Sequence, residues 1–173
     1  MMRLKYTLLA GAALGAPAAQ AAEMTLSIEI PTLPVAEYHR PYVAIWIAQA
    51  DQQFVDNLAV WYDLKMKDNE GTKWLKDLRQ WWRRSGRELS FPVDGVSSAT
   101  RAPGEHLVRS SDAKGGPLSK LAPGSYQIVV EAAREVGGRE LLRVPFTWPA
   151  SAGQSAQARG EHELGKVVLK LAP

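Results

Sequence analysis

The 173-residue sequence contains no cysteine and only three histidines, His39, His106 and His162. Without a thiol the chain has no cysteine nucleophile, no thiolate metal ligand, no disulfide and no site for covalent c-type haem. The histidines are far apart and none lies in an H-x-x-x-H or H-E-x-x-H pattern, so a zinc hydrolase has no support. His106 and His39 are weak candidates as haem or metal ligands; the ordinary alternative is a hydrogen-bonded loop histidine.

The usual signatures of hydrolases are also missing. The sequence has no G-x-S-x-G motif, and Ser97 and Ser98 near Asp94 form a combination too common to define a catalytic triad. Glu131 and Glu135 are expected to be surface charges on one strand, not paired catalytic carboxylates. The sequence therefore contains no catalytic constellation, and we do not expect an enzyme.

Neither a strong charge imbalance nor a long hydrophobic segment is present. The net charge is +3, and without Arg3 and Lys5 it falls to about +1, which does not indicate nucleic acid or an anionic membrane as a partner. The apolar run from Tyr6 to Ala16 is too short and too rich in Ala and Gly to span a bilayer. We expect a protein that is not embedded in a membrane.

The N-terminal segment has the pattern of a secretory leader. Basic residues precede the apolar run, and small residues around Ala19-Gln20-Ala21 follow it, as at a signal-peptide cleavage site. No cysteine follows these small residues, so a lipid anchor is not indicated. The prediction is a cleaved signal peptide at residues 1–22, a single domain at residues 23–173, and a periplasmic location.

The rest of the chain predicts short strands joined by turns. MTLSIEI (24–30) alternates with period two, YVAIWIAQADQQFVDNLAVWY (42–62) has the pattern of a hairpin, and both faces of its first strand are apolar. A second hairpin is expected around a two-residue Gly137-Gly138 turn, then a polar loop ASAGQSAQARG (150–160) and a final strand. About seven strands in this order favour a mainly β fold, an antiparallel immunoglobulin-like β-sandwich.

One segment changes period and predicts a short inserted amphipathic helix. From Thr72 to Ser85-Gly86, Trp74, Leu78 and Trp81 or Trp82 recur at helical spacing. The favoured interpretation is that the tryptophans pack on the sheet. The alternative is that they stack on an aromatic cofactor or a sugar while Arg79, Arg83 and Arg84 hold a phosphate.

The segment Asp94-Gly95-Val96-Ser97-Ser98-Ala99-Thr100 resembles the attachment motif of proteins that carry covalent FMN. That motif runs D, two variable residues, S or T, G, A, then T or S, so Asp94, Ser97, Ala99 and Thr100 match and Ser98 replaces the Gly. The resemblance implies that a magnesium-dependent FAD:protein FMN transferase esterifies the Thr100 hydroxyl with the flavin phosphate. Arg101 would supply a neighbouring cation. A purely structural turn is the alternative.

Several longer stretches, among them KWLKDLRQWWR (73–83), VDGVSSATRAPGEH (93–106) and GEHELGKVVLKL (160–171), look like the predicted periplasmic family named domain of unknown function 2271. The resemblance covers nearly the whole mature chain. The family carries no established activity; it implies a genetic context of PepSY-type membrane reductase components and the flavin transferase. In addition, SSDAKGGPLSKLAPGSYQIVVEA (110–132) is similar to a hairpin of the Ig-like domain in flagellar hook-capping proteins, which favours the sandwich.

Together these features predict a periplasmic accessory protein of an extracytoplasmic redox system. In this hypothesis FMN on Thr100 carries electrons, Arg101 pairs with its phosphate, and Trp81 or Trp82 shields its ring. The expected partners are a membrane-bound PepSY-type reductase and the flavin transferase. The alternative is a cofactor-free binding or scaffolding module for a membrane partner, haem or a metal chelate, with His106 or His39 as first candidates.

Overall fold

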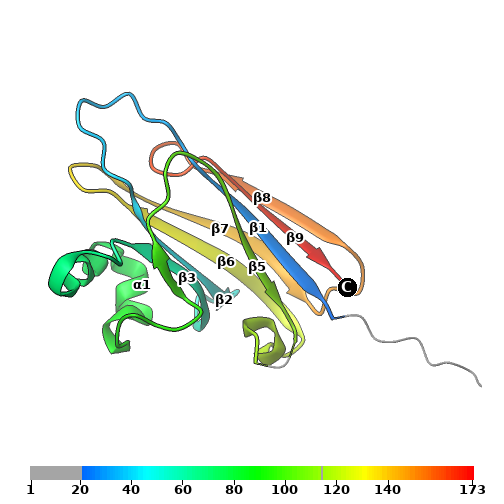
Figure 1. The fold of residues 1–173 in the computed structure, drawn as a ribbon. Helices are drawn as coiled ribbons and strands as arrows, with labels where there is room; N and C mark the ends of the chain where they lie inside the picture. The colour runs from blue at the N-terminus through cyan, green and yellow to red at the C-terminus, as the bar shows by residue number, and fades with distance from the viewer. Residues whose placement is uncertain (1–20, 114) are drawn as a thin grey trace, which may run out of the picture.

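The computed structural model describes residues 21–113 and 115–173 (Figure 1). The expected signal peptide, apart from its last two residues, lies outside the described residues, and its cleavage stays a prediction. The single-domain organisation also stays a prediction. The first strand begins at Glu23, directly after the expected leader.

The strands form two sheets, whose neighbours are hydrogen-bonded in the order given. The first sheet contains β5 (Gly104–Ser111), β1 (Glu23–Ile30), β9 (Lys166–Ala172) and β8 (Gln154–Arg159). The second sheet contains β4 (Ser97–Ala99), β3 (Phe54–Tyr62), β2 (Tyr42–Gln49), β6 (Gly124–Ala133) and β7 (Arg139–Trp148). The mainly β, sandwich-like fold is confirmed.

Between the two sheets lies an inner core of apolar side chains. On β1 every second residue from Met24 to Ile30 is buried, as period-two alternation requires. These side chains meet Val43, Ile45 and Ile47 of β2 and the alternate residues of β6. The expectation that both faces of β2 are covered is correct, because Ala44, Trp46 and Ala48 belong to a second cluster on the other side.

The outer face of the second sheet is covered by a helical crossover that connects β3 to β4 (Figure 1). It contains the 3₁₀ segment η1 (Lys67–Asp77), the helix α1 (Arg79–Arg84) and the short turn η2 (Gly86–Glu88). Leu75, Leu78 and Trp81 form an outer core with the sheet. Another 3₁₀ turn, η3 (Pro117–Lys120), precedes β6.

The predicted helix from Thr72 to Ser85 was therefore only partly correct. It is interrupted at Leu78, whose φ of −75° and ψ of 70° are not helical. The crossover also makes β4 parallel to β3, so the second sheet is not wholly antiparallel. A long connection allows such a parallel pair, whereas a tight hairpin does not.

Three further expectations differ from the structure. The described residues contain nine strands, not about seven, because the polar stretch at 150–160 forms the edge strand β8 and part of the FMN-like motif forms β4. The turn between β6 and β7 is not centred on Gly137-Gly138. Gly137 N donates to Arg134 O, which places Glu135 and Val136 at the centre, and Val136 takes a positive φ of 51°.

Candidate functional site

A cleft of about 710 Å³ lies where the helical crossover, residues 38–42 and the β6–β7 turn come together. Its size is within the range of small-molecule sites. Four arginines line it: Arg40, Arg79, Arg134 and Arg139. The acidic side chains of Asp63, Asp77 and Glu135 also line it. The cleft is thus a charged site with several guanidinium groups that can bind an anion.

Thr100, the residue of the FMN-like motif that would be esterified, lies in this cleft. Its backbone N–H donates to Tyr62 O at 3.2 Å, which continues the pairing of β4 with β3. Its hydroxyl lies 3.5 Å from Asp63 Oδ1, at the long limit of a hydrogen bond. Thr100 is only 9% exposed. The hydroxyl is therefore at the cleft wall beside a carboxylate, not on an open loop.

The other motif residues do not line the cleft. Asp94 and Ala99 are exposed, and Ser97 Oγ accepts a hydrogen bond from Val93 N at 2.9 Å. Arg101 lies over the ring of Trp61, with 5.2 Å from its Cζ to the ring centroid. The structure does not place Arg101 in the cleft, so the cations near Thr100 come from other segments of the chain.

The tryptophan that lines the cleft is neither Trp81 nor Trp82, the two predicted to face a cofactor. Trp81 is fully buried, and its Nε1 donates to Asn57 Oδ1 at 2.8 Å. Trp82 is partly buried against the same outer core. Trp74 is 51% exposed and lines the cleft. Packing on the sheet is thus confirmed for Trp81, while Trp74 is the tryptophan that lines the cleft.

The two histidine candidates lie in different surroundings. His39 lines the cleft, with Nε2 2.8 Å from Glu37 Oε1 and Nδ1 3.5 Å from Glu135 Oε2. His106 Nε2 lies 2.7 Å from Ala102 O, and its ring contacts Trp61 edge to face. Within residues 21–113 and 115–173, no cluster of three or more histidine and carboxylate side chains could hold a metal ion.

Glu131 was expected at the surface, but it is fully buried beneath the crossover. It lies on the outer face of β6 and accepts hydrogen bonds from Trp81 N at 2.8 Å and Gln80 N at 3.1 Å. Arg139 Nη1 also donates to it at 2.8 Å. Glu131 therefore fixes the start of α1 and positions Arg139 at the cleft. A lone Glu in the apolar run IVVEAA (128–133) is the signal that could have revealed this.

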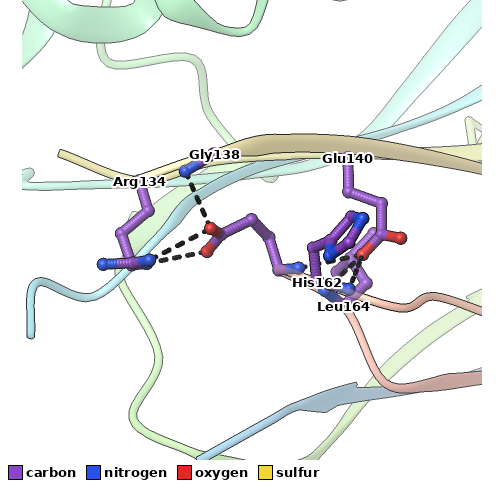
Figure 2. Close-up of polar contacts among 6 residues, drawn as sticks. Arg134, Gly138, Glu140, His162 and Leu164 are labelled. Carbon is purple, nitrogen blue, oxygen red and sulfur yellow. Dashed lines mark hydrogen bonds and ion pairs between the residues drawn. The ribbon is translucent and has the colours of Figure 1, made fainter. Parts of the chain in front are cut away.

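Arg134, which lines the cleft, forms a buried ion pair with Glu163, and Figure 2 shows the surroundings of Arg134. Arg134 Nε and Nη2 donate to the two oxygens of Glu163 at 2.7 and 3.1 Å, and Gly138 N donates to Glu163 at 2.8 Å. The hydrogen bond to Glu163 raises the pKa of Arg134. Arg134 is thus permanently charged and rigidly held.

Figure 2 also shows how Glu140 holds the loop between β8 and β9. Its carboxylate accepts hydrogen bonds from four consecutive backbone N–H groups, those of residues 161–164. Burial alone would raise the pKa of Glu140, but these donors outweigh it and lower the pKa. The loop that carries Glu163 is therefore fixed by a second carboxylate.

Two phenols line the cleft as neutral donors. Burial raises the pKa of Tyr42 to about 12, and burial also raises the pKa of Tyr38. Both side chains therefore remain protonated at neutral pH.

The fold and the cleft define a class of mainly β proteins with two packed sheets, a helical crossover and an arginine-lined, ligand-sized site. Within that class, the chain belongs to the family described as "Predicted periplasmic protein (DUF2271)", which matches residues 23–166. The expected periplasmic location agrees with this description. In the comparisons with curated proteins and with solved structures, nothing matches the chain.

None of the helices in the described part of the chain has both the length and the apolar character needed to cross a membrane.

Proposed function

We propose that this protein is an accessory component of a periplasmic redox system and carries FMN as an ester of Thr100. The observation that supports the proposal is the position of the Thr100 hydroxyl in a ligand-sized cleft that also contains arginines and an exposed tryptophan. The electron partner is a membrane-bound PepSY-type reductase, and the FAD:protein FMN transferase loads the flavin.

Attachment transfers the FMN phosphoryl group from FAD to Thr100 and needs no oxidant. The Thr100 oxygen displaces AMP from the pyrophosphate of FAD, so one P–O bond forms, one breaks, and the hydroxyl proton leaves. In the closed structure the hydroxyl is held 3.5 Å from Asp63 Oδ1; in the reaction its proton passes to a base of the transferase or to water. When attached, the flavin supplies one- and two-electron chemistry.

The side chains of the cleft fit such a group. Arg79, from the start of α1, and Arg139, held by Glu131, both line the cleft and can pair with a phosphate. Trp74, half-exposed at the rim, can stack on a flavin ring. Together these residues replace Arg101, Trp81 and Trp82 in the roles expected from the sequence.

The burial of Thr100 imposes one condition on this function. A transferase reaches the hydroxyl only when β4 moves away from β3. β4 is a three-residue strand at the edge of its sheet, so a local opening of this kind costs little compared with global unfolding.

Coexpression with the transferase, followed by intact-mass measurement, tests the proposal. We expect the mass to increase by one FMN ester in the wild type and in Ser98→Ala, and to be unshifted in Thr100→Ala. Ser98→Gly, which restores the motif, should raise the flavinylated fraction because Gly allows closer approach of the phosphate. An unshifted wild-type protein, or a shift that survives Thr100→Ala, overturns the proposal.

A second candidate function is a cofactor-free binding or scaffolding module that uses the same cleft. Large exposed apolar side chains gather there, since Met66, Trp74 and Val136 are all exposed and all line it. Such a rim is typical of a ligand or partner site. Absorbance of the protein purified from periplasm separates the cases, because flavin absorbs near ~450 nm and haem near ~410 nm, whereas a scaffold is colourless.

A further inference from the structure

Two polar atoms at the wall of the cleft lack hydrogen-bond partners. They are Tyr38 Oη and Arg134 Nη1, which are both shielded from solvent. Both residues line the cleft, and the Arg134 side chain is only 6% exposed. The hydrogen bonds of Arg134 run to Glu163, and in Figure 2 the outer nitrogen of Arg134 has no dashed contact. Unpaired buried donors are rare in native proteins and point to a missing acceptor.

From this arrangement we infer a second binding position in the cleft, in which Arg134 Nη1 and Tyr38 Oη donate hydrogen bonds to an oxyanion. The position does not depend on flavin attachment at Thr100. Its ligand is a phosphoryl or carboxylate group, because a guanidinium can only donate, a phenol hydroxyl can also donate, and an oxyanion accepts from both.

The guanidinium is fixed before any ligand binds. Its Nε and Nη2 are held by Glu163, which is itself fixed by Gly138 N. On its other side it lies against the β6–β7 turn, since a Cβ at Gly137 would be only 2.5 Å from Arg134 Cζ. Only glycine allows the turn to approach so closely. A side chain that is ordered in advance loses little entropy on binding, so even a small anion can bind it.

The surrounding charges are compatible with an anion. Arg40 and Arg139 line the same cleft and can complement the charge of the ligand, while Glu135 on the turn opposes it. His39 belongs to the segment of residues 38–42 and contacts that turn, since its Nδ1 lies 3.5 Å from Glu135 Oε2. Because both donor atoms are shielded, an anion reaches them only when residues 38–40 move away from the turn.

The test uses the protein expressed without the transferase, so its outcome is independent of flavinylation. Inorganic phosphate and acetate are titrated separately at constant ionic strength, with chloride as the balancing salt. The readout is the NMR signal of the Arg134 Nε–H group. We expect a saturable shift with at least one of the two anions. If phosphate alone saturates, the ligand is phosphoryl; if acetate binds more tightly, it is a carboxylate.

Tyr38→Phe removes one donor and leaves the Arg134–Glu163 pair intact. Loss of one hydrogen bond to an anion should weaken binding by about tenfold. Tyr126→Phe is the matched control, because its hydroxyl bonds to Ala122 O away from this position and its loss should leave the affinity unchanged. Gly137→Ala should weaken binding as well, by displacing the guanidinium.

Three results would overturn the inference. One is a linear response that chloride reproduces. Another is a saturable response of equal affinity in wild type and Tyr38→Phe. The third is an equal loss of affinity in Tyr38→Phe and Tyr126→Phe, which would indicate a general effect on stability.

Discussion

The two faces of the second sheet are covered in different ways. The inner face meets the first sheet mainly through apolar side chains, such as Ile45 and Ile128. The outer face meets a helical crossover and includes the buried carboxylate of Glu131. The inner face therefore provides most of the stability by burial, whereas the outer face uses hydrogen bonds of fixed geometry to position the cleft.

The strongest test of this contrast is Ile45→Ala, which removes a fully buried side chain from the inner core. We expect the free energy of unfolding in urea to fall by about 2–5 kcal/mol, because a cavity is left in a closely packed interior. The Arg134 Nε–H signal of the folded protein should not change. A loss below about 1 kcal/mol would show that the inner face is loosely packed.

Glu131→Gln tests the outer face. The amide keeps an acceptor but loses the charge that Arg139 and two backbone N–H groups contact. We therefore expect the free energy of unfolding to fall by about 1–3 kcal/mol. Amide hydrogen exchange at Gln80 and Trp81 should accelerate more than exchange in β1. Glu135→Gln, an exposed change on the neighbouring turn, is the control and should cost less than about 0.5 kcal/mol. Equal effects of the two variants would contradict the role of Glu131.

The smallest expected effect on stability comes from Glu140. This β7 residue lies at the end of the inner face and joins the two sheets by hydrogen bonds to the β8–β9 loop. Its folded pKa is lowered from the ordinary value of 4.5, so its stabilising contribution is present above about pH 4.5 and is lost as the pH falls through the folded pKa. The stability difference between wild type and Glu140→Gln should therefore shrink on acidification. A difference that stays constant down to acid pH would show that the charge of Glu140 is unimportant.

Much of the inner face could be predicted from the sequence. Alternation in MTLSIEI and YVAIWIAQ correctly assigned side chains to faces, because the period of a strand is a local property. The crossover was harder to predict. Trp74, Leu78 and Trp81 share a helical period, yet the chain bends at Leu78 and leaves Trp74 at the surface, since the carboxylate of Glu131 sets where α1 begins.

The cleft was predictable only in part. Thr100 was singled out by the motif, and its place in a ligand-sized cleft could not be known from neighbouring residues. Tyr38, Asp63 and Arg134 come from three distant segments and carry no motif. Arg101 adjoins Thr100 in sequence, but it stacks on Trp61 because adjacent residues of an extended chain point in opposite directions.

The sequence by itself determined the β-rich class, the apolar faces of the strands, the expected periplasmic location and the choice of Thr100 as the residue to test. Only the tertiary structure decided which charges meet. Glu163 and Arg134 look like ordinary surface residues in the sequence, and only the apolar run around Glu131 hints that this third residue is buried. They become a buried framework because the crossover and the turns bring donors from distant segments to each carboxylate, and a buried charge is stable only where such donors converge.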